Sequence, residues 1–215
     1  TLTATDGSTQ DITITINGAD DAPVLSTPTA GSIAETAGSS DTTTSGLTGT
    51  LSASDADGDT LTYAITGGST TDGVSTLAGS YGSLSLNTST GEYTYTPDSS
   101  AVEALDNGDS ATDSFTLTAS DGTDTTSATY TVNLTGADDS SVISATTTGS
   151  LTEDSGTSTV TGSISIADPD ADDSPSFPDV SSTASDNGYG SYSLSSGTWS
   201  YTLSNPPALA AGAST

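Results

Sequence analysis

The stretch FTLTASDGTDTTSATYTVNLTGADD, residues 115–139, determines the expected fold. Apolar and polar residues alternate over 115–119 and again over 130–134, and Asp121-Gly122 lies between the two runs. Alternation at period two is typical of a strand with one buried face, and an Asp-Gly pair favours a tight turn. The stretch is therefore predicted to form a β-hairpin that leads into an acidic linker.

The same alternation recurs along the rest of the chain, separated by turns rich in Gly, Asp, Asn and Ser. It is found over 12–16, 61–65, 84–86, 93–95 and 164–166. Several short strands, each with one apolar face, are typical of an antiparallel β-sandwich. The fold class is therefore predicted to be all-β, with one helical turn expected over 101–105 and a counterpart over 208–211.

The chain repeats itself at a period of about 110 residues, which is the size of a whole domain rather than of a solenoid unit. TLTATDG at 1–7 returns as TLTASDG at 116–122, and the GADD of 18–21 returns at 136–139. We therefore expect residues 1–21 to hold the last two strands of one repeat and a linker. Residues 22–139 are expected to form a complete repeat with its linker, and 140–215 a second repeat without its last two strands.

This frame has two interpretations. The segment is either a window from a long array of repeats, or a tile whose first strands complete the open sheet of a neighbouring copy by strand addition. An unpaired final sheet would otherwise expose its edges.

Charge limits the possible functions. The chain has 28 Asp and Glu and no Lys, Arg or His, so no carboxylate can pair with a basic side chain of its own protein. The natural counter-ion is Ca²⁺, a hard cation that prefers oxygen ligands. Nucleic acid and anionic membranes would repel such a chain, and no apolar run is long enough to cross a bilayer. Without Cys there are no disulfides, and without His or Cys no common hydrolytic triad forms, so an enzyme is not expected.

Acidic residues recur in turns and linkers, where they are candidate Ca²⁺ ligands. Alternate Asp residues in one turn can direct several carboxylates toward one ion, while Ca²⁺ needs six to eight oxygens in all. The candidates are the turn residues Asp55, Asp57, Asp59, Asp168, Asp170 and Asp172, the linker residues Asp20, Asp21, Asp138 and Asp139, and also Glu35, Asp121 and Glu153.

A topological argument brings these candidates together. If the strands run up and down, the turn after the second strand lies at the end where the chain enters the domain. This places the 55–59 turn beside Asp20-Asp21, and the 168–172 turn beside Asp138-Asp139. The hairpin turn at Asp121 is expected at the same entry end, and Glu35 at the far end near the second linker.

Aromatic residues also recur at matching strand positions: Tyr93 and Tyr95 correspond to Trp199 and Tyr201. Stacked sugars are one possible role for such residues. A place in the core for at least one residue of each pair is the favoured interpretation, because a chain rich in Ser and Thr needs bulky side chains there.

The closing strands and linker at 115–122 and 130–139 resemble those of VCBS-type, cadherin-like repeats, which fill the long extender regions of bacterial RTX adhesins. The segments 82–86, 91–95 and 102–105 fit the middle of the same pattern. The resemblance implies tandem Ig-like sandwiches joined by short Ca²⁺-binding linkers, exported to the surface of a Gram-negative bacterium. The linker after Asp139 departs from the family pattern, because Ser140-Ser141 stands where the first linker has Ala22-Pro23.

We therefore expect calcium-stiffened extender repeats of a large cell-surface adhesin that acts in cell adhesion and biofilms. Two alternatives are a self-assembling extracellular filament with strand complementation between copies, and a carbohydrate-binding adhesin module. The expected partners are neighbouring repeats of the same or identical chains, with surface glycans bound through other domains. Nucleic acid binding and membrane insertion are not expected.

Overall fold

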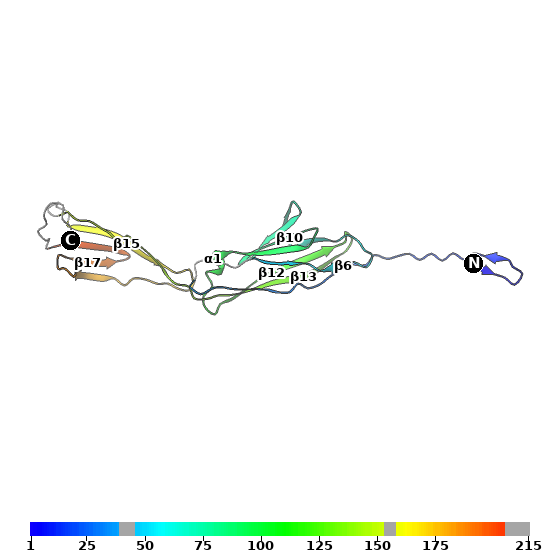
Figure 1. Ribbon diagram of the computed structural model, residues 1–215, viewed down its shortest axis with the longest axis horizontal. Helices are drawn as coiled ribbons and strands as arrows, with labels where there is room; N and C mark the ends of the chain where they lie inside the picture. The colour runs from blue at the N-terminus through cyan, green and yellow to red at the C-terminus, as the bar shows by residue number, and fades with distance from the viewer. Residues whose placement is uncertain (39–45, 153–157, 205–215) are drawn as a thin grey trace.

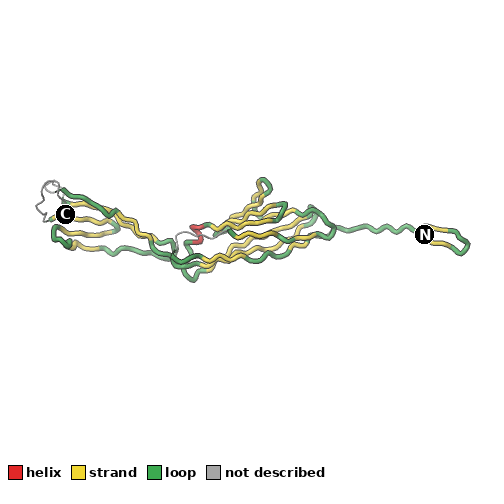
Figure 2. The backbone as a smooth tube through the Cα atoms, viewed as in Figure 1, coloured by secondary structure: helices red, strands yellow, loops and turns green. Residues whose placement is uncertain are grey.

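The computed structural model describes residues 1–38, 46–152 and 158–204, and it is elongated (Figure 1). From the N-terminus it consists of a small hairpin, an extended segment, a complete β-sandwich (the first repeat) and a further sheet (the second repeat). Strands dominate along the whole length, with a single short helix in the described part (Figure 2). The prediction of an all-β protein is confirmed.

The strands are β1 (Leu2–Thr3), β2 (Thr9–Gln10), β3 (Val24–Leu25), β4 (Gly31–Ala34), β5 (Leu47–Thr50), β6 (Ala53–Ser54), β7 (Thr62–Ile65), β8 (Ser69–Thr71), β9 (Val74–Ala78), β10 (Gly82–Asn87), β11 (Glu92–Pro97), β12 (Ser110–Ser120), β13 (Thr125–Thr135), β14 (Val142–Ala145), β15 (Thr159–Ala167), β16 (Val180–Ala184), β17 (Gly190–Ser195) and β18 (Thr198–Leu203). The helix α1 (Ser99–Val102) begins two residues before the helical turn expected over 101–105 and overlaps its first two residues, while the counterpart expected over 208–211 lies outside the described residues. The Asp98 carboxylate caps it by accepting the backbone N–H groups of Ser100 and Ala101.

Two sheets form the first repeat. One has the strand order β5-β11-β10-β9-β8 and the other β4-β13-β12-β7, while β3 and β6 pair separately. The predicted hairpin of 115–139 forms as β12 and β13, which pair over their full lengths, Ser110 with Thr135 and Ser120 with Thr125.

One pairing departs from the expected antiparallel pattern: β4 runs parallel to β13, with Gly31 opposite Val132 and Ala34 opposite Thr135. A hairpin turn cannot make such a pair, so long connections must join the two strands. The consequence is that Glu35 and Gly136 leave the sheet at the same end.

The core of the first repeat lies between the two sheets, and its residues follow the alternation seen in the sequence. Leu84 and Leu86 on β10, and Leu117 and Val132 on β12 and β13, are all fully buried. The Tyr93 ring lies 4.9 Å from that of Tyr130, and Tyr95 is also fully buried. The interpretation of Tyr93 and Tyr95 as core residues is confirmed.

Asp113 is a charged member of this interior, only 4% exposed. It accepts hydrogen bonds from the backbone N–H groups of Ser80 (2.8 Å) and Tyr81 (3.1 Å), and from the Tyr95 hydroxyl (2.7 Å). A buried carboxylate is stable only when its oxygens are satisfied in this way. Asp113 therefore connects β12 to the turn between β9 and β10.

The second repeat has one sheet within the described residues, with the order β14-β15-β18-β17-β16. Its strands β15, β18, β17 and β16 stand in the same order as β5, β11, β10 and β9 of the first repeat, whereas β14 corresponds in sequence to β3, which pairs with β6 outside that sheet. Trp199 stands opposite Gly162 as Tyr93 stands opposite Gly49, and in both pairs a Cβ on the glycine would overlap the aromatic ring. The repeat inferred from the sequence is thus also a repeat of side-chain packing.

Residues 12–16, expected to form a strand, are unpaired. Beyond the short hairpin β1-β2, residues 11–22 are extended but belong to no sheet, and Ile12, Ile14 and Ile16 are 60%, 81% and 90% exposed. An isolated two-stranded hairpin is marginally stable, since it has no neighbouring strands to cover its apolar face. The alternating pattern of residues 12–16 is that of a strand, and the segment is extended, but no described strand lies beside it to pair with.

Replacing Asp113 with Ala is expected to destabilise the first repeat by about 3 kcal/mol, because the Tyr95 hydroxyl and two amides would lose their acceptor. Urea unfolding in saturating Ca²⁺, followed by tyrosine fluorescence, measures the change. Glu92→Ala removes one charge from an exposed site on β11 and serves as the control. Equal stability of the two variants would contradict the assigned role of Asp113.

Candidate metal centres at the ends of the first repeat

Acidic residues gather at both ends of the first repeat. At the end where the chain enters, the entry cluster comprises Asp20, Asp21, Asp55, Asp57 and Asp121. At the opposite end, the junction cluster comprises Glu35, Glu103, Asp106, Asp138, Asp139, Asp168, Asp170 and Asp173.

The entry cluster is organised by the turn after β6. Asp55 Oδ1 accepts the backbone N–H groups of Asp57, Gly58 and Asp59 at 2.9, 3.0 and 3.2 Å, which closes the turn. Asp57 then reaches the linker, where its Oδ2 accepts the N–H of Asp21 at 2.8 Å. The structure thus places this turn beside Asp20-Asp21, as the up-and-down topology predicts.

The hairpin turn after β12 lies at the same end. Asp121 Oδ1 accepts the N–H groups of Thr123 and Asp124, both at 2.7 Å, and these bonds lower the pKa of Asp121. Desolvation raises the pKa of Asp20, and the negative charge of Asp121 adds to the effect. Asp55 Oδ2 and Asp121 Oδ2 are buried without a hydrogen-bond partner, so each carboxylate keeps one oxygen unused by its turn.

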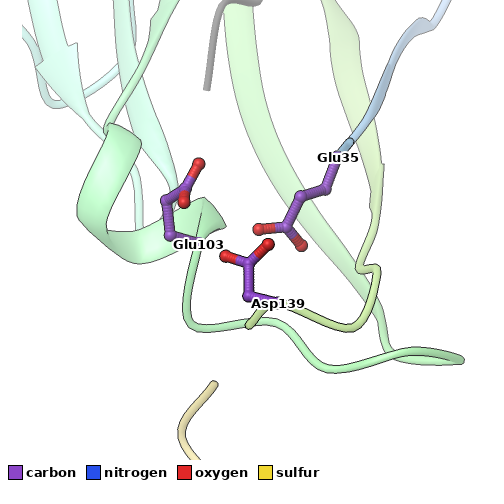
Figure 3. Close-up of side chains that lie close together, drawn as sticks. All are labelled: Glu35, Glu103 and Asp139. Carbon is purple, nitrogen blue, oxygen red and sulfur yellow. The ribbon is translucent and has the colours of Figure 1, made fainter. Parts of the chain in front are cut away.

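The junction cluster is more crowded. Glu35, Glu103 and Asp139 each offer one oxygen, and these atoms all lie within 4.8 Å of one another. Their carboxylates point toward a common space (Figure 3). The side chains are only 9%, 8% and 5% exposed, so solvent screens their mutual repulsion poorly.

Three different elements supply these three residues. Glu35 directly follows β4, and its N–H donates to Thr135 O at 3.0 Å, so the parallel β4–β13 pair sets its position. Glu103 ends α1. Asp139 lies in the linker, which passes close to the chain after α1. A Cβ at Gly136 would overlap the backbone of Leu105 and Asp106, so the approach requires glycine there.

Glu35 is held by one oxygen and leaves the other unused. Its Oε2 accepts the N–H of Ala137 at 3.0 Å, while Oε1 is buried without a hydrogen-bond partner. Burial raises the pKa of Glu35, and the nearby charges of Asp139 and Glu103 raise it further. This is the expected behaviour of a buried carboxylate among other negative charges.

Two further groups of three carboxylates share Asp170. One consists of Asp106, Asp138 and Asp170, and the other of Asp168, Asp170 and Asp173. Asp170 is 1% exposed; its Oδ2 accepts the N–H of Asp139 at 2.7 Å, and its Oδ1 is buried without a partner. Burial raises the pKa of Asp170, and Asp106 and Asp139 contribute by repulsion.

Direct contacts bring the second repeat into the junction cluster. The N–H of Ala171 donates to Ala104 O at 3.4 Å, and the Ser141 hydroxyl donates to Asp168 Oδ2 at 2.6 Å. Gly38 donates its N–H to Asp138 O at 2.9 Å. Residues from β4, α1, the linker and the second repeat therefore meet at one place.

The chemistry of this donor set suits a hard cation. All side-chain donors are carboxylate oxygens, and the chain contains no His or Cys to attract a softer metal. Among the candidates, unpartnered buried oxygens such as Glu35 Oε1 and Asp170 Oδ1 are the atoms that an ion would satisfy. The residues present thus fit Ca²⁺, which accepts many oxygens in a flexible geometry.

The sequence identified most, but not all, of these residues. Among the candidates predicted from the sequence, Asp59 is exposed at the edge of the entry turn, and Asp172 is exposed and belongs to none of the three close groups of carboxylates. Another candidate, Glu153, lies outside the described residues. The sequence did not identify Glu103, Asp106 and Asp173. Glu103 could have been recognised as a candidate ligand from the sequence, because it is an acidic residue within the otherwise apolar run of 101–105.

Comparison with protein families matches residues 20–136 to the bacterial cadherin-like domain. The match covers more than half of the chain, beginning within the first GADD motif and ending at the first residue of the second. No curated protein matches the chain. Within residues 1–38, 46–152 and 158–204, no helix has the length and apolar character needed to cross a lipid bilayer.

The raised pKa of Glu35 and of Asp170 predicts how the metal-free chain responds to pH. A carboxyl whose pKa is raised on folding binds more protons in the folded state, so stability is greatest at low pH and is lost as pH rises through the folded-state pKa. In chelator, the melting temperature is expected to rise as pH falls from 7 to about 5. Glu35→Gln should weaken this dependence.

Glu92→Gln, on the exposed face of β11, is the control for that measurement. It removes the same charge and should leave the pH dependence as in the unmodified chain. If Glu35→Gln and Glu92→Gln give the same profile, the junction carboxylates are not the source of the effect.

Proposed function

Because this chain belongs to the family of bacterial cadherin-like domains, we propose that it is a structural extender segment of an extracellular adhesin, stiffened by Ca²⁺ at its repeat junctions. Domains of this fold serve structure and adhesion rather than catalysis. Their usual location is outside the cell. The proposed segment holds a distal binding domain away from a bacterial surface.

The observation that carries this proposal is the junction cluster. Its three groups of carboxylates are linked through Asp139 and Asp170, whose direct hydrogen bond joins the linker to the turn of the second repeat. An ion bound there would contact residues on both sides of the joint. It would therefore resist bending as well as local unfolding.

Electrostatics explains why the joint should depend on the ion. Two unit charges 4 Å apart repel by about 4 kcal/mol at an effective dielectric constant of about 20. Several such pairs occur in the junction cluster, and no basic side chain offsets them. Without a cation the simplest relief is for the linker to swing away from α1 and β4. With Ca²⁺ the same charges become ligands, which favours the closed joint.

The entry cluster supports the same role at the other end of the first repeat. It repeats the turn and linker elements of the junction cluster, with the Asp57–Asp21 bond in place of Asp170–Asp139.

Glycan binding is better assigned to other domains of the adhesin than to the first repeat. The tyrosines that could have stacked sugars, Tyr93 and Tyr95, are 8% and 0% exposed. Action in biofilms and membership of the RTX adhesins are further parts of the proposal, supported by the resemblance of the closing strands and linker.

Adding Ca²⁺ is expected to raise the melting temperature of the chain and to lengthen it. Bound ligand stabilises by about 2.7 kcal/mol per site at a hundredfold excess over its dissociation constant. Calorimetry and small-angle scattering, each in Ca²⁺ and in chelator, measure the two effects. If chelator leaves both the melting temperature and the maximum dimension unchanged, the proposal fails.

Two neighbouring acids provide a matched pair of variants. Asp170→Asn removes a charge shared by two carboxylate groups, whereas Asp172→Asn removes an exposed charge two residues away in the same turn. Calcium titration should show a roughly tenfold or greater loss of affinity for Asp170→Asn and little change for Asp172→Asn. The reverse order would contradict the assignment of the junction cluster.

A further inference from the structure

The turn between α1 and β12 holds Asn107-Gly108, an asparagine followed directly by glycine. The chain has three such pairs, the others being Asn17-Gly18 and Asn187-Gly188. Asparagine is a thermolabile residue, because the backbone nitrogen of the next residue can attack its side-chain amide carbon. Glycine favours the attack, since it has no side chain to shield its nitrogen and its backbone is free to adopt many conformations. The reaction also requires that this N–H is not already held by a hydrogen bond.

A β-turn is built around the Asn107-Gly108 pair. The N–H of Asp109 donates to Asp106 O at 2.9 Å, so Asn107 and Gly108 are the two central residues of the turn. Gly108 has a φ of 98°, a conformation that favours glycine. Both residues are exposed, and among the described residues neither the Gly108 N–H nor the Asn107 side chain has a hydrogen-bond partner. The attacking nitrogen and its target are therefore both free.

The turn at Asn187-Gly188 provides a comparison within the same chain. Its two residues are also exposed, and Gly188 also has a positive φ, of 70°. There, however, the N–H of Gly188 donates to Ser185 O at 2.9 Å. An attack by this nitrogen must first break that bond. The two pairs have the same sequence, but only the glycine of the first has a free N–H.

The Asn107 turn packs against the linker that leaves the first repeat. The N–H of Gly136 donates to Asp109 O at 3.0 Å. A Cβ at Gly136 would lie 2.4 Å from Asp106 O and 2.5 Å from Leu105 O, so no spare room separates the turn from the linker. A longer backbone in the turn would therefore displace the linker.

We propose that Asn107 is a site of spontaneous deamidation, and that the isoaspartate it forms loosens the contact between this turn and the linker. The Gly108 nitrogen forms a bond to Cγ of Asn107 while the Cγ–Nδ2 bond breaks. The departing nitrogen takes up the proton of the Gly108 N–H and leaves as ammonia, which produces a cyclic imide. Water then opens the imide at either of its two carbonyl carbons. One opening gives aspartate, and the other gives isoaspartate, in which the main chain runs through Cγ.

The products change both the charge and the length of the turn. Each replaces a neutral amide with a carboxylate beside Asp106, and no basic side chain offsets the added charge. Isoaspartate also adds a methylene group to the main chain inside the turn that the Asp109–Asp106 bond closes. This bond and the Gly136–Asp109 bond are therefore expected to weaken. Because ammonia is lost, the change accumulates as the protein ages.

Incubation of the full chain in neutral buffer with Ca²⁺, followed by chymotrypsin digestion and mass spectrometry, measures the two turns in one sample. Conversion is expected to be roughly fivefold or more faster at Asn107 than at Asn187, which is the factor that one hydrogen bond supplies. An isoaspartyl methyltransferase, which labels isoaspartate but not aspartate, identifies the product. Equal rates at the two sites, or a faster reaction at Asn187, would overturn the proposal.

Two variants connect the modification to the linker. Asn107→Gln keeps an amide but requires a larger ring that forms more slowly, and Asn187→Gln makes the same change in the comparison turn. Hydrogen exchange of the linker segment around Gly136 is measured before and after incubation. Exchange is expected to become roughly fivefold faster on full conversion in the parent chain and in Asn187→Gln, and to stay constant in Asn107→Gln. Identical ageing of the two variants would contradict the proposed effect on the linker.

The consequence for Ca²⁺ binding rests on the proposed function. Asp106 shares a carboxylate group with Asp138 and Asp170, and Asp138 lies two residues after Gly136. Displacement of the linker would separate these ligands, so conversion to isoaspartate should lower the Ca²⁺ affinity roughly tenfold. A fresh chain that binds no Ca²⁺ would refute the proposed function, whereas the rates at Asn107 and Asn187 would still decide the modification. Equal Ca²⁺ affinity before and after full conversion would overturn the loosening of the joint.

Discussion

Carboxylate repulsion is the constraint on which the arrangement of these repeats depends. Backbone amides reduce this repulsion locally. The carboxylate of Asp57 accepts a hydrogen bond from the N–H of Asp21, that of Asp170 from Asp139, and that of Glu35 from Ala137. Each of these bonds uses one oxygen and fixes the orientation of the carboxylate. An amide dipole weakens the repulsion but leaves the net charge in place, so neutralisation must come from the medium. In the proposed function, a cation neutralises the charge that these bonds leave in place at the joint.

Sheet geometry connects this electrostatic problem to the core. The parallel pairing of β4 with β13 brings Glu35 to the end where the linker leaves, and the close approach at Gly136 brings the linker to α1. Both features rest on the buried residues of β12 and β13. A weakened core would thus misplace the ligands, and a bound ion would in turn hold β4 and the linker against the sandwich. If the junction cluster binds Ca²⁺ as proposed, the stability of the fold and the affinity of the site are linked for this reason.

The sequence was sufficient for the features that depend on period and order. Alternation predicted the β12-β13 hairpin, and the internal repeat with an up-and-down topology placed the 55–59 turn beside Asp20-Asp21. It was not sufficient where position depends on tertiary packing. Glu103 and Asp106 follow a helical turn whose docking no local pattern encodes, and the parallel pairing of β4 joins residues about a hundred positions apart. Ile12, Ile14 and Ile16 show the opposite limit: their pattern is that of a strand, but pairing requires neighbours that the sequence pattern of the segment itself cannot supply.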